Sequence, residues 1–295
     1  MRKIEIIGSK MDLGASKKGV DKGPEAIREM GLVQEITNLG YDVIDHGDVI
    51  PMEAISIGST KMRYEKEINE ANNRLFNKVI QIHSNKSFPI IIGGDHSIAA
   101  GSISASASCF GSLGVIWVDA HGDFNDDIIS PSGNIHGMPL SAVCGCGPES
   151  LVGFAKGRIK PQNVVIIGAR ALDKLERIKL KRYHVTVFSI EEIHILGIEK
   201  VINCAIEIAS NGTEGIHLSF DMDAIDPKYA PGVGTPVING LKPNECFTIC
   251  EKLFLSKRLL AMDLVETNPF LDIGNMTAIL AKNIILNCLG SKIVY

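Results

Sequence analysis

Short apolar runs alternate with longer amphipathic segments from one end of the chain to the other. Two of the runs, Ile90–Ile92 and Val164–Ile167, are uninterrupted, which is typical of strands covered on both faces in a parallel sheet. Eight strands are predicted, at Lys3–Ile7, Tyr41–Ile44, Phe88–Ile92, Leu113–Val118, Asn163–Ile167, Val185–Ser189, Gly215–Ser219 and Leu259–Leu264. Helices are predicted at Pro24–Leu39, Tyr64–Ser84, Ser97–Ser108, Glu191–Leu196, Ile198–Ser210, Pro243–Leu255 and Met276–Cys288.

This alternation predicts an α/β fold built from strand–helix–strand units around one sheet. No linker rich in proline or serine, no low-complexity tract and no internal repeat divides the sequence, so we expect a single domain over residues 1–295. Two long polar segments, Gly122–Gly137 and Ala224–Gly240, are rich in glycine and proline. They are predicted to be functional loops.

Composition and charge exclude several classes of protein. The chain has 295 residues, of which 45% are hydrophobic, enough to bury a sizeable core and too many for general disorder. A net charge of −4 predicts no broad surface for nucleic acid or for an anionic membrane. The sequence contains no run of 18 apolar residues, so no transmembrane helix is predicted. Glu5 interrupts the first apolar run, which favours a strand over a signal peptide.

The cysteines favour a reducing compartment. There are seven of them, an odd and scattered set, so we expect free thiols and a cytoplasmic location. The pair Cys144 and Cys146 has no second cysteine pair to complete a metal site and is expected to be structural. Cys246 and Cys250 lie one helical turn apart and are expected to be small buried residues.

Histidine and carboxylate side chains gather where predicted strands run into loops. His96 follows a strand and two glycines, although a lone histidine in such a place is more typical of capping or packing. Asp119, His121 and Asp123 alternate after the strand that ends at Val118, and they share one face if strand geometry continues. Unpaired carboxylates there would repel each other unless a cation lies between them, so a metal site is favoured over a solvated acidic loop.

Asp221 and Asp223 repeat this alternation after another predicted strand, and they complete a set of two histidines and four aspartates. The set contains no thiolate, and oxygen ligands with two imidazoles suit Mn²⁺ better than a structural zinc or a copper site, although Co²⁺, Fe²⁺ or Zn²⁺ could bind. Four formal negative charges exceed what one cation needs. The sequence therefore favours two cations, bridged by carboxylate and hydroxide.

The loop Ser130–Pro139 contains small polar side chains and glycines that suit hydrogen bonding to a polar ligand. His136 within it is a candidate proton carrier. Taken alone, this segment fits an ordinary turn-rich loop equally well.

With these motifs the sequence resembles the ureohydrolase family, which includes arginases, agmatinases and formiminoglutamases. The resemblance covers nearly the whole chain and rests on Met11–Gly14, Gly19–Arg28, Gly93–Ser97, Asp119–Asp123 and Ser219–Pro227. It implies a three-layer α/β/α sandwich around a mainly parallel sheet. It also implies a homo-oligomer, either a trimer or a hexamer.

The resemblance assigns a role to each candidate residue. It implies a binuclear manganese site, two Mn²⁺ per chain, with the ligands His96, Asp119, His121, Asp123, Asp221 and Asp223. His136 matches the catalytic proton-shuttle histidine, and Glu266 matches the glutamate that pairs with the substrate guanidinium. The implied reaction is attack by a metal-bridging hydroxide on L-arginine, giving L-ornithine and urea, with Asp123 orienting the hydroxide.

The resemblance also bears on the substrate. A Ser-Gly-Asn element before the catalytic histidine distinguishes arginases from agmatinases, and here Ser132 and Asn134 are both present. Asn125 matches a further contact to the α-carboxylate, and Asp173 matches the acidic residue near the α-ammonium group. Thr235 matches a position in the wall of the pocket.

Two departures from the arginase pattern leave alternatives open. Asp126 and Asp127 stand where arginases usually carry a threonine-containing segment, and they are expected to repel an α-carboxylate, which favours agmatine or another guanidino compound. Ala171 replaces a second acid. A one-zinc deacetylase of related fold is disfavoured by the six ligands and Glu266. An inactive metal-binding regulatory or structural subunit is disfavoured because no ligand and no proton carrier is missing.

Overall fold

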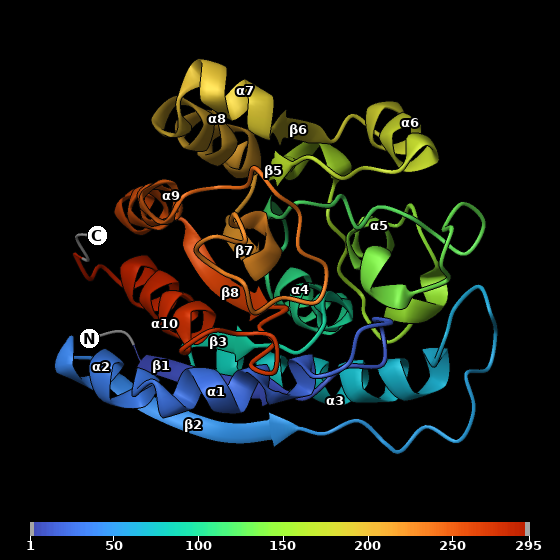
Figure 1. Cartoon of the computed structure of the whole chain (residues 1–295), viewed down its shortest axis with the longest axis horizontal. Helices are drawn as coiled ribbons and strands as arrows, with labels where there is room; N and C mark the ends of the chain where they lie inside the picture. Colours follow the sequence, from blue (N-terminus) through green and yellow to red (C-terminus); the bar gives the residue numbers. More distant parts are fainter. Residues whose placement is uncertain (1–2, 293–295) are drawn as a thin grey trace.

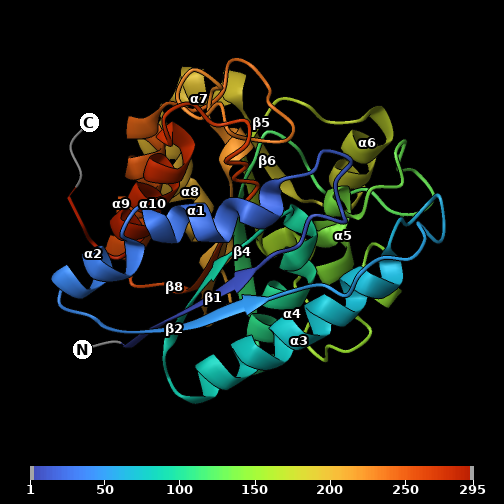
Figure 2. The same ribbon diagram turned by 60° about the horizontal axis from the view of Figure 1, so that its bottom comes forward.

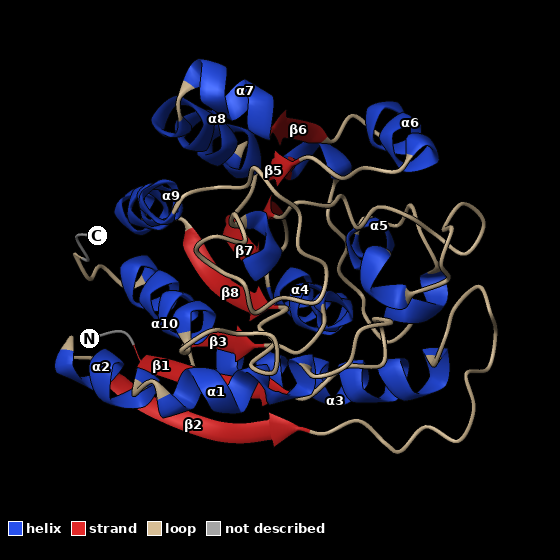
Figure 3. Cartoon of the chain, in the orientation of Figure 1, coloured by secondary structure: helices blue, strands red, loops and turns tan. Residues whose placement is uncertain are grey.

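The computed structural model describes residues 3–292, and the sheet at its centre has eight strands (Figure 1, Figure 3). Every pair of neighbouring strands is parallel, in the order β2-β1-β3-β8-β7-β4-β5-β6. The strands are β1 (Lys3–Ser9), β2 (Asp42–Val49), β3 (Phe88–Ile92), β4 (Leu113–Val118), β5 (Val164–Ala169), β6 (Thr186–Ser189), β7 (Gly215–Asp221) and β8 (Leu259–Val265). The parallel sheet and all eight predicted strands are confirmed.

Helices cover both faces of the sheet, which confirms the three-layer α/β/α sandwich (Figure 2). One face carries α3 (Glu65–Ser84), α4 (Ala99–Cys109), α5 (Pro139–Val143) and α6 (Lys174–Arg182). The other carries α1 (Gly23–Glu29), α2 (Leu32–Asn38), α7 (Ile190–Leu196), α8 (Ile198–Ser210), α9 (Pro243–Ser256) and α10 (Met276–Cys288). Within residues 3–292, no helix combines the length and apolar character that a membrane crossing requires.

The strands divide their side chains between two cores. In β3, Ile90 and Ile92 belong to the core on the side of α1 and α10, whereas Ile91 faces α3 and α4. This alternation follows from the two-residue period of a strand. Burying one such side chain stabilises the fold by ~1.5–3 kcal/mol before the entropy cost, so uninterrupted apolar runs suit a strand covered on both faces.

The predicted helix Pro24–Leu39 is wrong as a single element. It is divided into α1 and α2 because Gly31 adopts a φ of 81°, in the left-handed region that glycine enters without strain. Two helices were not predicted. α5 has only 5 residues, too few to show a period, and in α6 charged residues outnumber apolar ones two to one.

Six single-turn 3-10 helices complete the elements of residues 3–292. They are η1 (Val20–Lys22), η2 (His96–Ile98), η3 (Ile135–Gly137), η4 (Glu149–Val152), η5 (Pro161–Asn163) and η6 (Met222–Ala224). Three of them, η2, η3 and η6, lie in the loops that carry the candidate site residues.

Candidate active site

The four central strands of the sheet end side by side. Their register aligns one residue from each strand in a single row, composed of Ile92, Leu264, Phe220 and Val118. Polar groups follow directly after this row, namely His96 beyond β3, Glu266 beyond β8, Asp221 at the end of β7 and Asp119 beyond β4. In open α/β sheets, ligands bind at this carboxyl edge.

His96 is held in place by the turn that follows β3. A side chain at Gly94 would meet the carbonyl oxygen of Met11 at 1.7 Å, so only glycine lets the backbone pass here. Asp95 then caps η2 with its carboxylate. His96 is fully buried, and its ring stacks on Trp117 with centroids 3.9 Å apart and planes within 6° of parallel.

The residues after β4 converge by a different route from the one predicted. The expectation that strand geometry continues past Val118 is wrong, because β4 ends there and Asp123 adopts a φ of 46°. The loop nevertheless folds back over the sheet edge. Asp119 and Asp123 each place a carboxylate oxygen 3.2 Å from Nδ1 of His96, and Nδ1 of His121 lies 3.3 Å from Asp119.

The expected alternation of Asp221 and Asp223 is wrong for the same reason. Asp221 ends β7 and Asp223 lies on η6, a tighter helical turn. The backbone N–H of Asp223 donates to Oδ1 of Asp221 at 2.7 Å, which closes the turn and brings both carboxylates to the same side.

Two overlapping groups of ligand atoms result, and both include Asp119. His96, Asp119 and Asp221 form the first group, and Asp119, His121 and Asp223 form the second, with the ligand atoms of each group within 4.8 Å of one another. Nδ1 of His96 lies 3.1 Å from Asp221, and Nδ1 of His121 lies 3.1 Å from Asp223. A carboxylate shared between two groups is the arrangement expected of two neighbouring cations.

Ionisation is opposed at two carboxylates of the site and favoured at a third: burial raises the pKa of Asp119, but the hydrogen bonds and charges of His121 and His96 outweigh it and lower that pKa well below its usual value. Burial raises the pKa of Asp221 well above its usual value, and the charges of Asp223 and Asp119 raise it further. Burial and the charge of Asp119 likewise raise the pKa of Asp123 to about 6. Burial lowers the pKa of His121, but Asp223 and Asp119 outweigh it and raise that pKa far above its usual range. The site therefore attracts positive charge strongly.

The donor set fits divalent cations. Each of the two groups combines one histidine with two aspartates and contains no thiolate, a set of ligands that suits Mn²⁺ and related ions. Nδ1 of His96 faces three carboxylates within 3.2 Å, so a cation placed between them would meet an imidazole and several oxygens together.

Beside the cation groups, His136 and Glu266 form a pair. Nδ1 of His136 lies 3.3 Å from Oε1 of Glu266, which also accepts the backbone N–H of His96 at 3.0 Å. Burial lowers the pKa of His136, but the hydrogen bond and charge of Glu266 raise it to about 9. Glu266 adopts a φ of 65°, strain of the kind that persists where the surrounding structure enforces it.

A cavity of about 130 Å³ opens onto His136 and the cation groups, and five of the six proposed substrate contacts line it; the sixth, Glu266, is buried behind His136 and is not among the lining residues. The five lining contacts are Asn125, Ser132, Asn134, Asp173 and Thr235. The amide of Asn125 donates to Asp173 at 3.2 Å, and the hydroxyl of Thr235 donates to Asp223 at 2.8 Å. Thr235 thus touches a candidate cation ligand as well as the cavity wall.

Two residues of the site were not found from the sequence. Glu176 lines the cavity, accepts the backbone N–H groups of Phe124 and Asp173, and has a pKa that burial raises to about 7. The spacing of Asp173 and Glu176 is that of a capping box and could have revealed both Glu176 and α6. Ser16 exchanges hydrogen bonds with the side-chain amide of Asn134, and no local signal pointed to it.

The structure corrects the role expected for Asp126. Its Oδ2 accepts a hydrogen bond from Nζ of Lys179 at 2.6 Å, and its Oδ1 accepts the N–H groups of Ile128 and Ile129. These partners outweigh burial and lower the pKa of Asp126. Asp126 and Asp127 are both absent from the residues that line the cavity, so the expected repulsion of an α-carboxylate is not supported.

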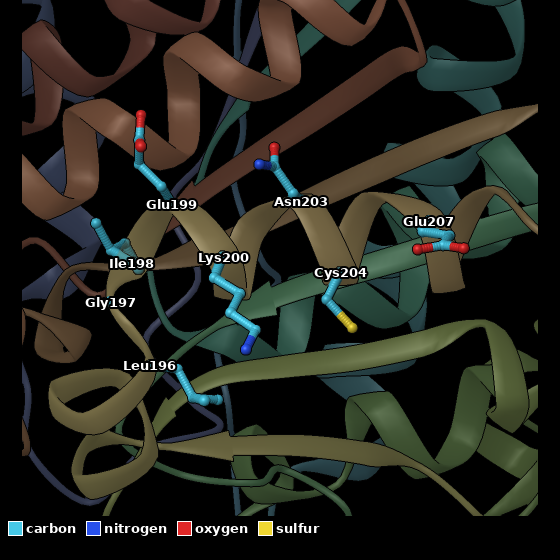
Figure 4. A pocket seen from close by; sticks show the side chains of 8 residues that line it. All are labelled: Leu196, Gly197, Ile198, Glu199, Lys200, Asn203, Cys204 and Glu207. Atoms are coloured by element: carbon cyan, nitrogen blue, oxygen red, sulfur yellow. The ribbon is translucent and has the colours of Figure 1, made fainter.

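A larger hollow, of about 730 Å³, lies away from the sheet edge along α8 (Figure 4). Its polar side chains stand one after another along the helix and point in different directions instead of converging. Glu199 pairs with Lys252 at 3.1 Å. Size alone therefore does not identify the site, whereas the convergent donors at the sheet edge do.

A parallel three-layer α/β fold with a histidine–aspartate cluster beside an acid–base pair is the architecture of a metal-dependent hydrolase. The chain belongs to the arginase family, whose model matches residues 2–290. It is 44% identical to an arginase of Brevibacillus brevis over 99% of both chains.

Solved structures agree with the family assignment. The arginase of Bacillus caldovelox superimposes with a TM-score of 0.96 at 41% identity and covers 100% of both chains. An arginase of Entamoeba histolytica, solved in complex with L-ornithine, superimposes with a TM-score of 0.91 at 30% identity, over 99% of this chain and 100% of the other.

Proposed function

We propose that this protein hydrolyses the guanidinium group of L-arginine to L-ornithine and urea, using two Mn²⁺ ions. The observation that supports this most directly is the pair of overlapping ligand groups that share Asp119, next to His136 and Glu266. The family assignment supports the reaction, since relatives over the full length are named arginases. The ornithine complex of the Entamoeba relative supports an amino-acid ligand.

The proposed cation ligands are the six side chains at the carboxyl edge of β3, β4 and β7, which are His96, Asp119, His121, Asp123, Asp221 and Asp223. Two divalent cations supply a hydroxide nucleophile near neutral pH by lowering the pKa of water. Asp123 lines the cavity as well as belonging to the proposed ligands, which suits it to orient this nucleophile and to take up a proton.

Glu266 is proposed to hold the substrate guanidinium and so to present its carbon to the nucleophile. The carboxylate is buried, and an opposite charge is its natural partner. His136, only 3.3 Å away, has a pKa raised to about 9 and is therefore protonated at neutral pH. It is placed to give a proton to the departing amine.

The far end of the cavity is proposed to bind the amino-acid part of arginine. Asn125, Ser132 and Asn134 offer amide and hydroxyl donors for the α-carboxylate, and Asp173 offers a carboxylate for the α-ammonium group. Asp126 is held by Lys179, which removes the reason to prefer a substrate without a carboxylate.

The test is urea release from L-arginine and from agmatine in parallel, after warming with Mn²⁺ and after chelation. We expect manganese-dependent release from arginine, and at least tenfold less from agmatine. Urea release from agmatine alone would contradict the proposal that the far end of the cavity binds the α-carboxylate and α-ammonium groups of arginine. If neither substrate releases urea although two Mn²⁺ are bound, the substrate is another guanidino compound. Parallel assays with Co²⁺, Zn²⁺ and Mg²⁺ test the choice of metal.

We further propose that the protein is a cytoplasmic homo-oligomer, a trimer or a hexamer. The seven cysteines are all unpaired, as expected in a reducing compartment. Large apolar side chains are exposed close together at the start of α10, at Phe270, Leu271, Ile273, Met276 and Ile279. Such a patch is typical of a contact between copies. Sedimentation equilibrium would separate the two assemblies from a monomer.

A further inference from the structure

Beneath the site, a row of polar side chains crosses the sheet where apolar packing is expected. The register pairs Trp117 of β4 with Ser219 of β7, and Ser219 with Asp263 of β8. All three are fully buried, and so is His217, which stands on the same face of β7. Burying a carboxylate in the core of a parallel sheet costs free energy unless hydrogen bonds or an opposite charge compensate for the lost hydration.

The partners of Asp263 converge on one of its oxygen atoms. Oδ2 accepts the hydroxyl of Ser102, on α4, at 2.8 Å and the hydroxyl of Ser219 at 3.4 Å, and Nε2 of His217 lies 3.1 Å from it. Oδ1 has no hydrogen-bond partner among the described residues. Oδ2 therefore acts as an acceptor whether or not the carboxyl group is ionised, because a proton would sit on Oδ1.

This arrangement favours a hydrogen on one particular nitrogen of His96. The hydroxyl of Ser219 has a single hydrogen, and Oδ2 of Asp263, 3.4 Å away, is an acceptor for it. The oxygen of Ser219 also lies 2.8 Å from Nε2 of His96, so when its hydrogen is donated to Asp263 it accepts from an Nε2 that carries a hydrogen. A neutral His96 is then left with its lone pair on Nδ1, the atom that faces Asp119, Asp123 and Asp221.

We propose that Asp263, acting through Ser219, is a positioning residue that fixes the ring of His96 with Nδ1 free to bind one of the two cations. The inference rests on the cation site of the proposed function, and it adds two residues that touch neither cation nor substrate. Groups behind a metal-binding histidine commonly fix its tautomer and orientation, and their loss weakens metal binding about 10–100-fold. Trp117 assists by stacking on the same ring.

The alternative is a purely structural role, in which Asp263 only joins β7, β8 and α4. The two roles differ in what Ser219→Ala changes. That variant keeps the contacts of Asp263 with Ser102 and His217, and it removes the long hydrogen bond from Ser219 to Asp263 together with the contact to His96. A structural role predicts lower thermal stability with unchanged metal affinity, whereas a positioning role predicts weaker metal binding with nearly unchanged stability of the chelated protein.

The experiment is calorimetric titration of the chelated protein with Mn²⁺, together with the electron paramagnetic resonance spectrum of the bound ions. We expect Ser219→Ala to weaken one of the two binding events about 10–100-fold and to leave the other within threefold. At limiting Mn²⁺, the spectrum should change from that of a coupled pair to that of a single ion. Asp263→Asn should act in the same direction with a smaller effect, and it decides the question if Ser219→Ala does not fold.

Ser104→Ala is the matched control, because Ser104 is a buried serine on α4 whose hydroxyl has no hydrogen-bond partner among the described residues. We expect it to bind both ions like the wild type. Equal affinities for wild type and Ser219→Ala would overturn the inference, as would loss of both ions together with loss of stability. A wild-type protein that binds no Mn²⁺ would instead overturn the proposed cation site.

Discussion

Two clusters of charged side chains sit on this sheet, and they are built in opposite ways. At the edge formed by β1 and β2, Arg28 of α1 donates to Asp45 at 2.7 Å and to Asp48 at 2.5 Å. Beside them, the buried Glu5 contacts His46 at 2.6 Å and accepts the hydroxyl of Ser87. Each of these carboxylates has a partner of opposite charge or a donor within the protein.

At the central site, four carboxylates share only two imidazole partners, His96 and His121. Burial raises the pKa of Glu5, but Ser87 and His46 outweigh it and the pKa falls, whereas the pKa of Asp221 is raised by burial and by its acidic neighbours together. The edge cluster thus stabilises the fold by itself. In the central cluster, the raised pKa values of Asp221 and Asp123 show that holding these two carboxylates ionised costs free energy, a cost that a bound cation would offset.

The largest expected difference between the clusters is in turnover. Asp123→Asn removes a proposed cation ligand that is also the proposed proton acceptor, so we expect urea release to fall by at least ~10³-fold. Asp48→Asn removes a carboxylate from the edge cluster and should leave kcat within twofold of the wild type. Steady-state urea release at saturating Mn²⁺ measures both. Near-normal turnover in Asp123→Asn would defeat the proposed mechanism.

His136→Asn should have a smaller effect, because the residue supplies a proton and holds no cation. We expect a loss of ~10²-fold in kcat, at the lower end of the usual range for a general acid. Metal content, measured by elemental analysis, should remain two ions per chain. A loss of metal in this variant would place His136 among the ligands and contradict the assignment.

Stability should respond to charge removal with opposite signs in the two clusters. Because the folded pKa of Asp221 is raised, the chelated wild type binds more protons than the unfolded chain above pH 3.8 and loses stability as pH rises through that window. Asp221→Asn has no such loss, so at pH 8 the chelated variant should be more stable than the chelated wild type. Asp48→Asn leaves part of Arg28 unpaired and should be less stable by ~1 kcal/mol.

Urea denaturation of the chelated proteins at pH 5 and pH 8 measures these differences. The advantage of Asp221→Asn should grow between the two pH values. Equal destabilisation of both variants would show that removing a carboxylate has the same effect on the free energy of unfolding in the two clusters, and would contradict this prediction.

The smallest expected effect concerns Lys179, which gives Asp126 the kind of internal partner found in the edge cluster. Lys179→Met should leave Asp126 charged and unpaired near the amino-acid end of the cavity, raising KM for arginine about fivefold, or ~1 kcal/mol. KM for agmatine, which has no carboxylate, should change less than twofold. Adding Asp126→Asn should restore the value for arginine, and no recovery in the double variant would contradict a charge effect.

Much of the site could be predicted because its ligands lie in short segments. His96, Asp119 and Asp221 each follow an apolar run closely, so a strand followed by a polar side chain is visible locally. The conformations of the connecting loops were not predictable. Asp123 takes a left-handed φ and Asp223 lies on a 3-10 turn, whereas a period of two had been expected for both. Local alternation carries no information on where a strand stops.

The sequence by itself determined the eight strands, the parallel sheet and most of the candidate residues that the structure brings together at the sheet edge. These follow from hydrophobic periodicity and from motifs a few residues long, which act through neighbours along the chain. Only the tertiary structure decided that Lys179 neutralises Asp126 across 53 positions, and that Asp263 lies behind His96. The reason is physical: such contacts depend on the order and register in which distant strands pair, and no local pattern records that order.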